Sequence, residues 1–205
     1  MSTATDWYLS FAAAYVRGSL PAPAGMHALW ARPLAALRER EWSAVVQWGA
    51  AAELRLSRFA RTPLPARVRA VLEWLERLAP ASLLDVGSGR GTFLWPLLEA
   101  RPALPVTAID ADPLRAQDLA AVRRGGVTTL AAYRMDAGAL AFPARQFDAV
   151  TVLEVLEHIP DWEAACAECV RVAARALLLS VPARPDNNPD HRHLLTEDRL
   201  TACLR

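Results

Sequence analysis

The sequence predicts an α/β fold in which a helical extension precedes a doubly wound, mostly parallel sheet. Residues 1–80 contain no convincing strand, whereas short apolar runs alternate with helical stretches from residue 81 onward. These runs are nearly continuous, which is typical of parallel strands covered on both faces. A glycine-rich turn follows the first run, as in sheets that bind a ligand at the carboxyl ends of their strands.

Residues 1–80 are predicted to form an N-terminal helical cap. Apolar residues recur at helical spacing over 26–41, 42–61 and 66–80. The PAPAG turn at 21–25 and the TPLP segment at 62–65 separate these stretches. We therefore treat 1–80 as an extension and 81–205 as the domain that carries the sheet.

The second part is predicted to alternate strands and helices in order. Strands are expected within 82–87, 105–110, 129–136, 147–155 and 176–182, and helices within 92–101, 113–125 and 161–174. Asp112 and Thr196 are the expected N-caps of the helices that follow them, because their side-chain oxygens can accept free backbone N–H groups.

The first strand of this part leads into a glycine-rich loop. Residues 83–93 read LLDVGSGRGTF, with Asp85 just before Gly87. Glycines let the backbone turn sharply and let a ligand lie against bare main chain. The helix that follows offers free N–H groups and a partial positive charge at its start. The spacing is G-x-G-x-G rather than the G-x-G-x-x-G of dinucleotide sites.

Two carboxylates lie where later strands are expected to end. Asp110 ends the second strand about twenty residues after the loop, where a carboxylate can accept both hydroxyls of a ribose. Asp136 follows the third strand. Nicotinamide dehydrogenases also place an acid at the first position, so Asp110 alone does not identify the cofactor. A helix cap is the alternative role for Asp110, although Asp112 is the better cap candidate.

The order of these motifs resembles the class I S-adenosylmethionine-dependent methyltransferases. The glycine loop, Asp110, Asp136 and LEVLEHI at 153–159 together span 83–161, a series that nicotinamide dehydrogenases lack. The resemblance is closest to the small-molecule group that includes the ubiquinone and menaquinone enzymes. It implies a Rossmann-like domain that binds S-adenosylmethionine and methylates a small-molecule acceptor at oxygen.

The resemblance also implies a role for each motif. The glycine loop wraps the methionine part of the cofactor, and Asp85 orients its amino group. Asp110 binds the ribose, Asp136 receives the adenine amino group, and the Ala137 N–H meets the ring. The expected cofactor-binding residues are Asp85, Gly87, Ser88, Gly89, Gly91, Asp110, Ala111, Asp136, Ala137 and Leu153.

Three histidines are candidate catalytic bases. A hydroxyl acceptor must lose its proton, and histidine is the usual base at neutral pH. The loops after the fourth and fifth strands flank the transferred methyl, which places His158 and His193 near the acceptor and His191 behind them. The alternative is that these side chains only cap or hydrogen-bond their loops.

The same residues offer a second interpretation as a metal site. Glu154, Glu157 and His158 form E-x-x-E-H, and His193 or His191 could complete a set that suits Mg²⁺ or Mn²⁺. This arrangement resembles the small-RNA terminal 2′-O-methyltransferases. The motif also occurs without metal in the wider family, so our main expectation is a site without a metal ion.

Composition argues against several classes of protein. The formal net charge of +1 indicates no strong field for nucleic acid or an anionic membrane. No signal peptide and no run of transmembrane length occur, so we expect a cytoplasmic protein. Cys166 and Cys169 form a CxxC within a predicted helix, without the second pair that a zinc site needs.

The sequence departs from the resembled family after the fifth strand. A complete class I sheet has seven strands, and strands six and seven have no sequence here to form them. The fifth strand would then be an open edge, which a homodimer or the N-terminal helices could cover.

Two alternatives to a small-molecule enzyme stay open: a metal-assisted RNA 2′-O-methyltransferase and a non-catalytic S-adenosylmethionine-binding protein.

Overall fold

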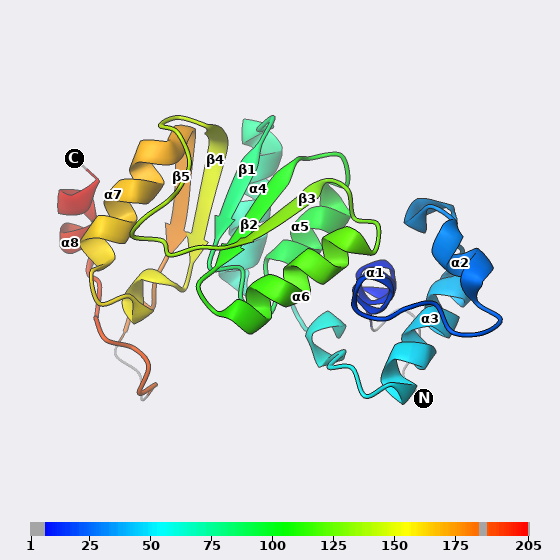
Figure 1. Cartoon of the computed structure of the whole chain (residues 1–205). Coiled ribbons are helices and arrows are strands. Elements are labelled where there is room, and N and C mark those ends of the chain that lie inside the picture. The colour runs from blue at the N-terminus through cyan, green and yellow to red at the C-terminus, as the bar shows by residue number, and fades with distance from the viewer. Residues whose placement is uncertain (1–6, 185–187, 205) are drawn as a thin grey trace.

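A parallel sheet forms the centre of the chain in a computed structural model that describes residues 7–184 and 188–204 (Figure 1). Its five strands lie in the order β3-β2-β1-β4-β5, and every neighbouring pair is parallel. The order reverses between β1 and β4, the point at which open α/β sheets bind ligands. The predicted α/β fold is confirmed. The strands are β1 (Leu83–Val86), β2 (Val106–Asp110), β3 (Leu130–Arg134), β4 (Phe147–Leu153) and β5 (Ala173–Ser180).

Helices cover both faces of the sheet because its apolar side chains alternate between them. Leu83 shares one hydrophobic cluster with α4 (Ala66–Leu78), α5 (Leu94–Ala100) and α6 (Pro113–Arg124). Leu84 shares a second cluster with α7 (Trp162–Val172). Asp112 caps α6 and Thr196 caps α8 (Glu197–Cys203), as the sequence predicts.

The N-terminal segment is helical but more broken than predicted. The described part contains α1 (Leu9–Ser19), α2 (His27–Ala31), η2 (Leu34–Ala36), α3 (Glu39–Ala51) and η3 (Ser57–Phe59). The expected helix over 26–41 stops before Pro33, because a residue preceding proline avoids the helical region and Arg32 is extended. The expected helix over 42–61 ends near Glu53, whose φ is 60°.

The fourth strand is also shorter than predicted. It ends at Leu153 because Glu154 has a φ of 57°, in the left-handed region, and η4 (Leu156–His158) follows. The chain therefore turns sharply at the carboxyl end of β4, directly beside the glycine loop after β1. Within the described ranges, no helix is both long and apolar enough to span a membrane.

Candidate functional site

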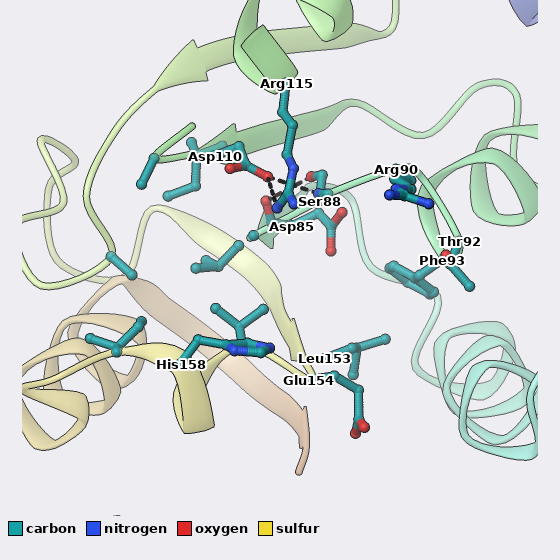
Figure 2. A pocket seen from close by; sticks show the side chains of 18 of the residues that line it. Asp85, Ser88, Arg90, Thr92, Phe93, Asp110, Arg115, Leu153, Glu154 and His158 are labelled. Atoms are coloured by element: carbon teal, nitrogen blue, oxygen red, sulfur yellow. Dashed lines mark hydrogen bonds and ion pairs between the residues drawn. The ribbon is translucent and has the colours of Figure 1, made fainter. Parts of the chain in front are cut away.

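A cleft of about 870 Å³ opens at the carboxyl ends of the strands (Figure 2). It joins segments that the sequence separates widely: the loop after β1, the end of β2, the turn after β3 and the turn after β4. Three of the residues predicted for the site do not line the cleft: Gly91, Glu157 and His193. The predicted site residues that do line it are Asp85, Gly87, Ser88, Gly89, Asp110, Ala111, Asp136, Ala137, Leu153, Glu154, His158 and His191.

The glycine loop is shaped by close contacts as well as by backbone angles. Gly87 has a φ of 70°, and a Cβ there would lie 2.5 Å from a methyl carbon of Val155. A Cβ on Gly91 would lie 2.1 Å from the indole nitrogen of Trp95. Gly91 therefore makes room for a buried tryptophan, whereas Gly87 and Gly89 form the cleft wall.

Asp85 presents a buried carboxylate to the cleft. The residue is 3% exposed, and its Oδ1 accepts a hydrogen bond from the Thr151 hydroxyl at 2.8 Å. Its Oδ2 has no hydrogen-bond partner among the described residues. Burial raises the pKa of Asp85 from 3.8 to about 6, while the nearby Ser88 and Thr151 hydroxyls oppose the rise. A buried carboxylate oxygen that lacks a hydrogen-bond partner among the described residues is suited to bind a cation.

Asp110 connects the end of β2 to the glycine loop. Its Oδ2 accepts the Gly89 N–H at 2.9 Å and its Oδ1 accepts the Asp112 N–H at 3.0 Å. Each carboxylate oxygen can accept a further hydrogen bond, so two ligand hydroxyls can still be held. Arg115 lies over the same carboxylate, 3.9 Å from Oδ2 (Figure 2).

Asp136 and Ala137 form another part of the cleft wall, in the turn after β3. Asp136 is exposed, and its Oδ1 accepts the Gly138 N–H at 2.8 Å. That bond fixes the turn and leaves the other carboxylate oxygen for a ligand. Ala137 is 8% exposed and packs among the residues of the α7 face.

Glu154 and Arg67 face each other where α4 approaches β4. Glu154 Oε1 accepts the Ser180 hydroxyl at 2.8 Å and lies 3.7 Å from Arg67 Nε. Arg67 and Arg115 also line the cleft, and neither is predicted from the sequence. Both lie on amphipathic helices whose exposed arginines look alike in sequence. Only the packing of α4 and α6 brings these two into the cleft.

Glu157, His158 and His191 come together at one side of the cleft. One ligand atom from each lies within 4.8 Å of the other two, and the imidazole centroids are 4.8 Å apart. Glu157 is 0% exposed, and neither carboxylate oxygen has a hydrogen-bond partner among the described residues. Burial raises the pKa of Glu157, and Glu154 adds to the rise, while His158 and His191 oppose it.

The predicted metal set is therefore only partly brought together. Glu154 is engaged with Ser180 and Arg67, and His193 Nε2 lies 3.1 Å from the carbonyl oxygen of Pro160. The loop that carries the histidines is fastened to the site by its backbone. The Arg192 and His193 N–H groups donate to the Glu157 carbonyl oxygen at 2.8 and 3.3 Å.

The sequence is similar to those of known methyltransferases. Residues 84–176 match a family model described as a methyltransferase domain. The ubiquinone biosynthesis O-methyltransferase of Pectobacterium carotovorum subsp. carotovorum is 32% identical over 110 residues, covering 53% of this chain and 45% of that protein. The nocamycin O-methyltransferase of Saccharothrix syringae is 34% identical over 106 residues, covering 51% and 38%. The chain thus spans less than half the length of these two relatives.

Solved structures share the fold at lower sequence identity. The YcgJ protein of Bacillus subtilis aligns with a TM-score of 0.56 and 20% identity, covering 67% of this chain and 65% of that chain. The cyclase SpnF aligns with a TM-score of 0.52 and 24% identity, covering 66% and 56%. These likenesses concern the fold alone.

Proposed function

Residues 84–176 form a class I S-adenosylmethionine-dependent methyltransferase domain, and from this premise we propose that the chain methylates an oxygen of a small-molecule acceptor. The observation that carries the proposal is the single cleft that joins Asp85, Asp110 and Asp136. The relatives named above, both O-methyltransferases, support oxygen as the acceptor atom. Acceptor and activity are proposals because the chain matches only part of those proteins.

The residues of the cleft fit S-adenosylmethionine. The partnerless, buried Oδ2 of Asp85 suits the ammonium group, and the glycine loop leaves bare main chain beside it. We assign the ribose hydroxyls to Asp110 and the adenine to Asp136 and Ala137. Arg67 is the guanidinium on the α4 side of the cleft, and we propose that it meets the carboxylate of the methionine part.

The cofactor supplies an activated methyl group, and the protein must position the acceptor and accept its proton. His158 and His191 line the cleft, whereas His193 does not and lies 3.1 Å from the Pro160 carbonyl oxygen. We therefore propose His158 or His191 as the base that accepts the acceptor proton. His193 positions the loop in this account.

Metal-assisted transfer is a second candidate, favoured by one specific observation. Glu157 is fully buried beside His158 and His191, and its two carboxylate oxygens have no hydrogen-bond partner in the part of the chain that the structure describes. A carboxylate and two imidazoles suit divalent ions such as Mn²⁺ or Zn²⁺. A bound ion there would satisfy the Glu157 carboxylate and orient an acceptor hydroxyl. No comparable observation favours RNA as the acceptor.

An acceptor screen with labelled S-adenosylmethionine tests both candidates. Small molecules bearing phenolic hydroxyls are incubated with the protein, with and without a chelator, and methylated product is counted. We expect product that depends on His158, so that His158→Ala lowers turnover while His27→Ala, on exposed α2, leaves it unchanged.

The chelator arm separates the two mechanisms. Activity that is lost with chelator and restored by Mn²⁺ or Zn²⁺ would support the metal site. Cofactor binding with no methylation of any acceptor would support the non-catalytic alternative.

A cytoplasmic location, and a homodimer that covers the β5 edge, stay predictions from the sequence.

A further inference from the structure

Three thiols gather where α8 packs against α7. Cys166 and Cys169 lie within α7 and are 1% and 0% exposed, and Cys203 is half-buried at the end of α8. None of the three takes part in the cleft. All are free thiols.

Cys203 faces Cys166 rather than Cys169. The Cys203 thiol lies 3.7 Å from the Glu163 carbonyl oxygen, and that carbonyl lies one helical turn before Cys166. Cys169 lies farther along the helix, well over one turn beyond the same carbonyl. The geometry therefore selects one pair among the three thiols.

A metal site does not account for this pair. Among residues 7–184 and 188–204, the one cluster of His, Cys, Asp and Glu arranged to hold an ion is Glu157, His158 and His191. The CxxC thus lacks the additional ligands that a thiolate metal site requires. A reversible covalent link between the two thiols is the chemistry that we consider instead.

A disulfide between α7 and α8 would also affect the cleft, because α8 follows a segment that lines it. The segment 188–195 leads directly into α8, and its residues 189–192 line the cleft. The segment is held by the Glu157 carbonyl oxygen and by the burial of Leu195, which is 4% exposed. Holding α8 against α7 would therefore hold the segment 188–195 over the cleft.

We propose that Cys166 and Cys203 form a reversible disulfide that fixes the segment 188–195 over the cleft and slows release of bound cofactor. The effect on cofactor release rests on the proposed function, whereas the disulfide itself does not.

A small disulfide such as oxidised glutathione supplies the oxidising equivalents. The Cys203 thiolate attacks one sulfur of that molecule and displaces one glutathione thiolate. The Cys166 thiolate then attacks the Cys203 sulfur of the mixed disulfide and displaces the second. Two protein thiols lose two protons and two electrons in total, and one glutathione disulfide becomes two thiols. Burial raises the pKa of Cys166 to about 12, so the more exposed Cys203 reacts first.

The test equilibrates the whole chain in buffers of reduced and oxidised glutathione, followed by non-reducing peptide mapping. We expect a peptide that links Cys166 to Cys203 in the wild type and in Cys169→Ser, and no linked peptide in Cys203→Ser. A Cys166–Cys169 link, a Cys203–Cys203 link between two chains, or no link at all would overturn the proposal.

Hydrogen exchange separates this proposal from the proposed function. Without any cofactor present, oxidation is expected to slow amide exchange in 188–195 severalfold in the wild type and in Cys169→Ser. With S-adenosylmethionine bound, the same oxidation is expected to slow its dissociation. Equal exchange before and after oxidation would refute the loop effect even if cofactor binding fails. Bound cofactor that leaves at the same rate in both states would refute the effect on release.

Discussion

At the scale of single residues, the cleft contains a buried carboxylate whose ionisation lowers the stability of the folded protein. Asp85 is buried, and one of its oxygens has no partner among the described residues. Because burial raises its pKa to about 6, ionising Asp85 at neutral pH is less favourable in the folded protein than in the unfolded chain. A bound cation would remove that penalty, so binding and stability are coupled at this side chain.

The first prediction concerns the pH dependence of stability. A carboxyl whose pKa is raised on folding stabilises the protein fully below its unfolded pKa, and this contribution is lost as pH rises through the folded pKa. For Asp85 that window runs from 3.8 to about 6, so its ionisation lowers the free energy of unfolding there. Asp85→Asn is expected to raise that free energy at pH 8 by about 1–3 kcal/mol.

Urea denaturation at several pH values measures this effect. Asp136→Asn, which alters an exposed carboxylate in the same cleft, is the matched control and should leave the stability near that of the wild type. Asp85→Asn should also lose S-adenosylmethionine binding, which calorimetry detects. A variant less stable than wild type at pH 8 would show that the Asp85 carboxylate contributes net stability.

The second prediction concerns Gly87. An alanine there must adopt a φ of 70° and place its Cβ 2.5 Å from Val155. Gly25 has a φ of 83° with nothing within 4 Å of its Cβ position, so Gly25→Ala isolates the backbone strain. We expect Gly25→Ala to lose about 1 kcal/mol in thermal or urea unfolding and Gly87→Ala to lose clearly more. Equal losses would show that Val155 moves aside freely.

At the scale of elements, the N-terminal helices are bound to the sheet domain by close backbone contact. A Cβ on Gly125 would lie 1.7 Å from the Ala14 carbonyl oxygen, and one on Gly18 would lie 1.9 Å from that of Ala121. The helices α1 and α6 therefore meet without intervening side chains, and α1 shares the hydrophobic cluster of α4, α5 and α6. This contact lies away from the cleft-lining residues, which suits a structural role for α1.

The third prediction tests that contact. Gly125→Ala is expected to destabilise the protein by about 1–3 kcal/mol, because the backbone atoms opposite cannot move aside as a flexible side chain could. Gly138→Ala, whose nearest neighbour would be the Asp136 carboxylate at 3.4 Å, is the matched control and should change the melting temperature little. If Gly125→Ala melts at the wild-type temperature, the two helices do not pack as closely as described.

At the scale of the whole molecule, the sheet and the meeting of Asp85, Asp110 and Asp136 in one cleft could be predicted from the sequence. Parallel strands are nearly continuous apolar runs, and the caps Asp112 and Thr196 act within a few residues of their own positions. The roles of Gly91, Arg67 and Arg115 could not be predicted, because they depend on contacts between distant segments. Gly91 accommodates Trp95, and each arginine reaches the cleft only through the packing of its helix.

The histidines illustrate the same limit. The sequence places His158, His191 and His193 near one another but cannot say which of them line the cleft. That depends on the backbone bonds from Arg192 and His193 to Glu157, which turn His191 toward His158 and His193 toward Pro160. His191 and His193 are only two residues apart in the sequence, yet their side chains have different neighbours.

Calorimetric titration measures whether the cleft binds S-adenosylmethionine, with NAD as the competing ligand and Asp110→Ala as the matched variant. We predict saturable binding of S-adenosylmethionine, no binding of NAD, and an affinity lowered by about 1–3 kcal/mol in the variant because hydroxyl partners lose their acceptor. Binding of NAD in place of S-adenosylmethionine, or no binding of either, would contradict the account.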